Sequence, residues 1–168
     1  MKTLSEWIST KYYNITYGVK NLWKWLPIVW KDRDWDHYYL YKLLNFKFKN
    51  MEYLHRNYSH IKNGDIIADQ LKVVKLLTKR LIEDNYIEKI WNDHDKKWGE
   101  IKWNYESTPT YKNCVEVFLK RENIKTEEDK KQERKEFRRM SDKEIMLRKQ
   151  DKEYLFELMN KNIEGWWD

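Results

Sequence analysis

The chain has 168 residues, of which 40% are hydrophobic, and its 34 basic and 28 acidic side chains give a net charge of +6. This length suits one domain with its own core, and the small basic excess permits an anionic partner without requiring one. No apolar run reaches the roughly 18 residues of a spanning helix, and a single cysteine excludes an intrachain disulfide, so we expect a cytoplasmic protein with no membrane partner.

Only four glycines and two prolines interrupt the chain, which favours long helices over short strands. The apolar residues include 10 Trp and 12 Tyr, so large amphipathic rings build much of the core. We predict a mostly α fold over residues 1–168, a single domain in which a helical hairpin and a C-terminal helix form a small bundle. A minor two-stranded β-ribbon could come from the segments 11–17 and 101–105.

Two segments with apolar side chains at steps of three and four predict the hairpin. In the first, from 34 to about 58, the repeating residues are Leu40, Leu43, Leu44, Met51, Leu54 and Tyr58. In the second, which follows Asn63-Gly64-Asp65, they are Ile67, Leu71, Val74, Leu77 and Leu81. Residues 94–113 are expected to be an irregular connection.

Residues 120–153 are dominated by charges of both signs, as in a solvated helix. Thr126–Asp129 matches a capping box that opens a charged helix, and the sequence leaves open that residues 120–141 project from the domain. A second box at Ser141–Glu144 is expected to open the last helix. Gly165 is expected to end that helix in a left-handed turn.

Residues 23–39 hold four tryptophans, three acids, three bases and a histidine. Planar rings beside cations suit a ligand that has a base to stack and a phosphate to neutralise. We therefore predict one wall of a nucleotide site here, formed by Trp30, Lys31, Arg33, Trp35 and His37. In the structural alternative the tryptophans anchor the N-terminal arm, while Asp34 or Asp36 caps the following helix.

Residues 91–99, WNDHDKKWG, are a second cluster of similar composition. If this segment folds over the hairpin, it adds a second wall to the same pocket, with His94, Lys97 and Trp98. The tryptophans would stack a base, the cationic side chains would hold phosphate and His37 would supply a hydrogen bond. We expect binding without turnover, and therefore no catalytic residue, metal or cofactor.

Two alternatives stay open. The protein could instead be an interaction module that inhibits a host protein through the charged helix and the terminal pair Trp166 and Trp167, although those rings could equally pack within the molecule. The adjacent His94 and Asp95 are also similar to the dyad of HD-type metal-dependent phosphohydrolases. A homodimer is compatible with either alternative, and a nucleic-acid partner is less favoured because acids nearly balance bases.

Four segments, WKWLPIVWKDRDWDHYYLYKLL, LLTKRLIEDNY, HDKKWGE and LFELMNKNIEGWWD, resemble a family of uncharacterised tailed-bacteriophage proteins. The resemblance spans most of the chain. It implies a small protein made in the cytoplasm of an infected bacterium, where a bound nucleotide could be a host defence signal. It assigns no residue a role.

Overall fold

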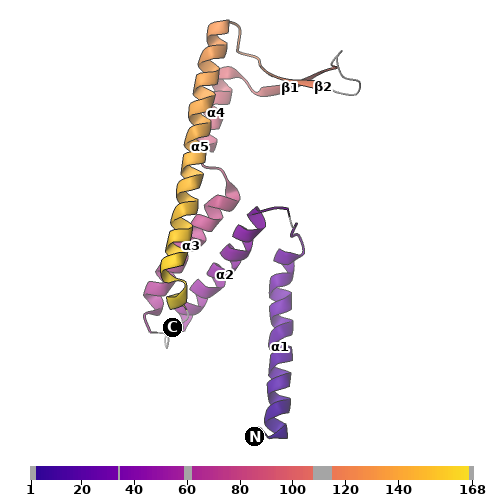
Figure 1. The fold of residues 1–168 in the computed structure, drawn as a ribbon, viewed down its shortest axis with the longest axis vertical. Coiled ribbons are helices and arrows are strands. Elements are labelled where there is room, and N and C mark those ends of the chain that lie inside the picture. Colours follow the sequence, from indigo (N-terminus) through magenta and orange to yellow (C-terminus); the bar gives the residue numbers. More distant parts are fainter. Residues whose placement is uncertain (1–2, 34, 59–61, 108–114, 167–168) are drawn as a thin grey trace. The chain divides into compact units, whose positions relative to one another are not determined.

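The computed structural model describes residues 3–33, 35–58, 62–107 and 115–166, and within them the fold is mostly helical with one β-ribbon, as predicted. Figure 1 shows the order of the elements. They are α1 (Leu4–Val29), α2 (Tyr38–Asn57), α3 (Gly64–Glu83), α4 (Glu88–Trp98), β1 (Ile101–Ser107), β2 (Val115–Arg121), α5 (Glu127–Asn162) and a 3₁₀ turn, η1 (Glu164–Trp166). None of the described helices is both long and apolar enough to cross a membrane.

The chain forms two compact units, which are described separately below. Unit 1 comprises Met1–Ile82 together with Lys161–Asp168, and unit 2 comprises Glu83–Asn160. Unit 1 therefore contains α1, α2, nearly all of α3 and the end of the chain. Unit 2 contains α4, the β-ribbon and most of α5.

Helix α1 begins with a capping box, in which the Thr3 hydroxyl accepts from the Glu6 N–H and the Glu6 carboxylate accepts from the Thr3 N–H. The strand suggested for residues 11–17 is wrong, because that segment lies inside α1. Its aromatic side chains follow helical spacing: Tyr13 and Tyr17, four residues apart, stack with ring centroids 5.9 Å apart. None of the residues of α1 is buried.

The predicted hairpin is confirmed as α2 and α3, which lie side by side in Figure 1. Helix α3 supplies much of the core of unit 1, because its stripe of aliphatic residues is buried along its whole length. The Asn45 side-chain amide on α2 donates to the Lys75 carbonyl at 2.7 Å and to the Thr78 hydroxyl at 2.8 Å, both on α3. These bonds satisfy polar groups in the contact between the two helices, which the ion pairs Glu52–Lys75 and Arg56–Asp69 also join.

The end of the chain packs on this hairpin through Trp166, which is 1% exposed. Its ring meets Phe48 edge-on at 5.7 Å, its indole N–H donates to Gln70 at 2.9 Å, and its carbonyl lies 3.0 Å from Nε2 of His55. The left-handed turn expected at Gly165 is wrong. That residue lies in the 3₁₀ turn η1 and has no positive φ.

Helix α5 of unit 2 is continuous for 36 residues. The capping box at its start is confirmed: the Thr126 hydroxyl accepts from the Asp129 N–H at 3.0 Å, and the Asp129 carboxylate accepts from the Thr126 N–H at 2.9 Å. The second box, at Ser141–Glu144, is wrong because those residues lie within α5. No glycine or proline interrupts Glu127–Asn162, so nothing ends the helix there.

The irregular connection expected over residues 94–113 is also wrong in its described part. Residues 94–98 are the last turns of α4, which ends at Gly99 with φ +85°, and the chain then enters β1. The strand suggested at 101–105 is confirmed. It pairs antiparallel with β2, from Ile101 opposite Arg121 to Ser107 opposite Val115. Residues 108–113 of that connection lie outside the described residues.

Candidate ligand-binding site

The residues predicted to form one nucleotide pocket fall into two groups. Trp30, Lys31, Arg33, Trp35 and His37 belong to unit 1, in the segment between α1 and α2. His94, Lys97 and Trp98 belong to unit 2, in the last turns of α4. Their union in a single pocket stays a prediction, and each group is described in its own unit.

The first group is largely open to solvent, with Trp35 83% exposed and Trp30 nearly as accessible. The Arg33 guanidinium donates to the carbonyl of its neighbour Asp32 at 3.2 Å. The Asp36 carboxylate accepts from the Tyr38 N–H at 3.0 Å, but the N-cap residue of α2 is His37, which makes no side-chain cap hydrogen bond, so the expected cap by Asp36 is wrong. Asp34 lies outside the described residues.

In the second group His94 and Trp98 are buried in unit 2, whereas Lys97 is exposed. Trp98 is 6% exposed, and its indole N–H donates to the Glu136 carboxylate of α5 at 2.7 Å. The other oxygen of Glu136 accepts from the Lys97 ammonium at 2.6 Å. The hydrogen bond from Lys97, together with the one from Trp98, lowers the pKa of Glu136 to about 2. One carboxylate thus holds the polar ends of two predicted ligand residues.

The His94-Asp95 pair does not form a metal cluster within the described part of the chain. Asp95 accepts from Nη1 of Arg121 at 2.6 Å, and His94 is 5% exposed with no hydrogen-bond partner for either ring nitrogen among the described residues. Burial, assisted by the positive charge of Arg121, lowers the pKa of His94. Nowhere among the described residues do three His, Cys, Asp or Glu side chains group as metal ligands.

Arg121 fixes the base of the β-ribbon to both helices of unit 2. Its Nη1 donates to Asp95 and to the Gly99 carbonyl, each at 2.6 Å, and its Nε lies 3.0 Å from the Glu133 carboxylate on α5. Gly99 allows this approach, because a Cβ there would come within 3.1 Å of the Glu122 nitrogen in a backbone conformation that disfavours side chains. Nη2 of Arg121 is buried and has no partner among the described residues.

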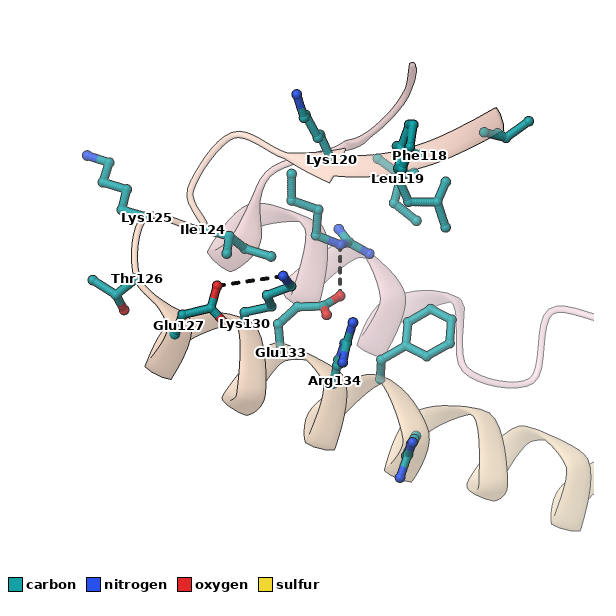
Figure 2. Close-up of a pocket in the computed structure, with 15 residues that line it drawn as sticks. Phe118, Leu119, Lys120, Ile124, Lys125, Thr126, Glu127, Lys130, Glu133 and Arg134 are labelled. Carbon is teal, nitrogen blue, oxygen red and sulfur yellow. Dashed lines mark ion pairs between the residues drawn. The ribbon is translucent and has the colours of Figure 1, made fainter. Parts of the chain in front are cut away.

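A hollow of about 980 Å³ lies between β2 and the first turns of α5 (Figure 2), near the upper end of the size range of small-molecule sites. Its walls come from unit 2 alone. The lining residues are Ile101, Val117, Phe118, Leu119, Lys120, Arg121, Ile124, Lys125, Thr126, Glu127, Lys130, Glu133, Arg134, Phe137 and Arg138.

The lining carries a net positive charge, with six basic and two acidic residues. Both acids are paired with lining bases, Glu127 with Lys130 at 3.6 Å and Glu133 with Arg121. Lys125 interacts electrostatically with the Asp129 carboxylate, whereas Lys120, Arg134 and Arg138 make no ion pair among the described residues. An anion entering the hollow would therefore meet positive charge that is not already neutralised.

The cationic side chains of the lining point in different directions. Figure 2 shows Arg134 pointing toward β2, whereas Lys120 and Lys125 point away from α5 at the rim. Arg138 follows Arg134 by four residues and so lies on the same face of the helix. The first turn of α5 is itself acidic and closed by its capping box, so an anion would be held by arginine side chains rather than by the helix N-terminus.

The apolar part of the lining comes from both walls. Alternation along β2 places Val117 and Leu119 on the same face as Arg121, whose side chain meets α5. Phe137 faces them from α5, with its ring against Trp91 at 5.3 Å. The hollow therefore combines cations with an apolar wall and two partly exposed aromatic rings, Phe118 and Phe137.

Sequence reasoning missed this hollow, because it depends on β2 folding back toward a helix that starts six residues later. Of the residues predicted for a partner surface, Trp166 is buried in unit 1 and Trp167 lies outside the described residues. No known protein family, curated protein or solved structure matches this chain.

Proposed function

We propose that the chain is a non-enzymatic binding protein that holds a nucleotide-type ligand in the hollow between β2 and α5. The observation that carries this proposal is the pair Arg134 and Arg138, two cations on one helix face without an ion-pair partner among the described residues, lining the same hollow as Phe137. A nucleotide has an anionic phosphate, which the two arginines can bind, and a planar base, which can stack on the Phe137 ring.

Each part of the lining has a role in this proposal. The guanidinium groups of Arg134 and Arg138 present forked donors that match phosphate oxygens. The unpartnered Nη2 of Arg121 adds a buried donor at the base of the ribbon. The ring of Phe137 offers a face on which a nucleobase can stack, an interaction of about 1–3 kcal/mol.

The lining favours binding over turnover. Among the described residues it contains no histidine or cysteine, and each of its two carboxylates is paired with a lining base. Neither carboxylate is therefore free to act as a general base. In the infected bacterium that the bacteriophage resemblance implies, such a protein would sequester a nucleotide signal of the host defence.

The experiment is a titration of the protein with ATP that carries a fluorescent ribose label, followed by fluorescence anisotropy. We expect Arg134→Ala to weaken binding at least about tenfold, because a charged hydrogen-bonding group is lost. Arg139→Ala is the matched control, since it removes the same charge from an exposed position of α5 that does not line the hollow.

Binding by the Arg139→Ala variant should stay within about twofold of the parent protein. Equal weakening by both variants would mean that binding depends only on the overall charge of the protein, which would contradict a site at Arg134. No binding of the labelled ATP by the parent protein would also reject the proposal. Chromatography of the nucleotide after incubation should recover it unchanged, whereas hydrolysis would contradict a non-enzymatic role.

A second candidate, binding of a host protein, is favoured by the β-ribbon. Trp103 and Tyr105 lie opposite Leu119 and Val117, on the face of the ribbon that also lines the hollow, and Trp103 is 61% exposed. Exposed aromatic side chains on a flat surface are enriched at protein interfaces. A Trp103→Ser variant that loses one stoichiometric partner in a pull-down from bacterial lysate, while it still binds the labelled ATP, would support this candidate.

A further inference from the structure

Helix α1 carries an apolar face that the other described residues of unit 1 leave uncovered. Its aliphatic residues recur at steps of three, four and seven, so they lie on one side of the helix. None of them is buried, and Ile15 at the centre is 66% exposed. The face extends for about 27 Å at 1.5 Å per residue, and its members are Leu4, Ile8, Ile15, Val19 and Leu22.

Aromatic side chains border this face on both sides. At 100° per residue, Trp7 falls on one edge and Tyr12 and Trp23 fall on the other. All three are exposed by more than half. Indole and phenol rings combine an apolar body with a polar tip, and they concentrate at the level of lipid headgroups in membrane proteins.

The charge of α1 suits an anionic surface. The helix contains three lysines and one glutamate. Lys20 and Lys24 lie on the side opposite the aliphatic residues, where they would reach headgroups beside the helix. Lys11 lies next to Trp7, with its ammonium 5.7 Å from the ring centroid, and its long stem can carry the charge outward past the apolar face.

A second copy of the helix would fit this face less well. A coiled-coil seam needs apolar residues at alternating steps of three and four. Starting from Leu4 and Ile8, these steps place Lys11 and Gly18 at core positions of the coiled coil. Neither residue has an apolar side chain that could pack into a partner helix. Contact with α2 is made instead near the end of the helix, where the rings of Trp25 and Phe46 meet at 4.6 Å.

We propose that α1 is an interfacial helix that lies along an anionic lipid surface, with its aliphatic face among the acyl chains and its tryptophans at the headgroups. This arrangement differs from a spanning helix, and it revises the expectation that the protein has no membrane partner. It does not depend on the hollow in unit 2, which belongs to other residues.

The test is co-sedimentation of the full chain with phosphatidylcholine vesicles that contain roughly a third phosphatidylglycerol. We expect binding to these vesicles, weaker binding to pure phosphatidylcholine, and a blue shift of tryptophan emission on binding. Ile15→Glu should weaken vesicle binding at least about tenfold, because it places a charge in the acyl layer. The residue is exposed, so the substitution should leave the fold intact.

Thr10→Glu is the matched control, because it adds the same charge on the opposite side of α1 at an exposed position. Its binding should stay within about twofold of the parent, and circular dichroism should show equal helix content in both variants. Equal loss in the two variants, or no binding of the parent to anionic vesicles, would overturn the proposal. So would a dimer in lipid-free solution that only Ile15→Glu dissociates, which would assign the face to a second copy.

Discussion

The segment between α1 and α2 and the last turns of α4 have nearly the same composition, yet their tryptophans are in opposite environments. Trp35 is 83% exposed, whereas Trp98 is 6% exposed and donates its indole N–H to Glu136. In sequence both segments are tryptophans among aspartates, lysines and a histidine. The difference shows that such a cluster indicates neither a site nor a core until the partner of each polar atom is known.

The largest expected effect is on stability. Trp98→Ala should lower the free energy of unfolding by about 3–5 kcal/mol, because it leaves a cavity in unit 2 and removes the hydrogen bond to Glu136. Trp35→Ala should change it by less than about 0.5 kcal/mol, since its ring is already solvated. Urea unfolding followed by circular dichroism measures both. Similar losses in the two variants would show that the exposed segment is part of a core.

A smaller effect on stability is expected from His94, a buried side chain that can gain a positive charge. Burial lowers its pKa, so the folded protein keeps it neutral while the unfolded chain binds a proton below a pH of about 6.5. Stability should therefore fall as the pH drops from 7 toward 5, by at most about 1.4 kcal/mol per pH unit for this one proton.

His94→Leu removes that proton site and replaces two ring nitrogens that have no hydrogen-bond partner among the described residues. The stability of this variant should depend less on pH over the same interval, while its helix content stays unchanged. Urea midpoints measured at several pH values provide the comparison. A variant with the same pH dependence as the parent would mean that His94 is not the group that titrates.

Local sequence signals predicted much of the fold. The aliphatic repeat of α3 and the capping box at Thr126 depend on residues within a turn of each other, and both are confirmed. The box at Ser141 failed because the same short pattern also occurs within an uninterrupted helix. The strand predicted for residues 11–17 was wrong. Aromatic residues are common in strands, but the spacing of four between Tyr13 and Tyr17 is that of a helix.

The candidate site was less predictable, because its partners are far apart in the sequence. Asp95 meets Arg121 across 26 residues, and Trp98 meets Glu136 across 38. Nothing near Arg121 in the sequence indicates that it ends a strand and contacts two helices. The sequence predicted an aromatic-basic ligand site in residues 30–37 and 94–98, a prediction that stays untested, whereas the hollow with that composition lies between β2 and α5.

The most direct test of that placement is amide hydrogen exchange of the protein with and without saturating ATP. Slower exchange is predicted in residues 115–121 and in the first turns of α5, up to residue 138, because the ligand would cover them and reduce local opening. Residues 30–37 should exchange at the same rate in both samples. Protection confined to residues 30–37, with none in β2 or α5, would contradict the account and place the nucleotide at the exposed tryptophans.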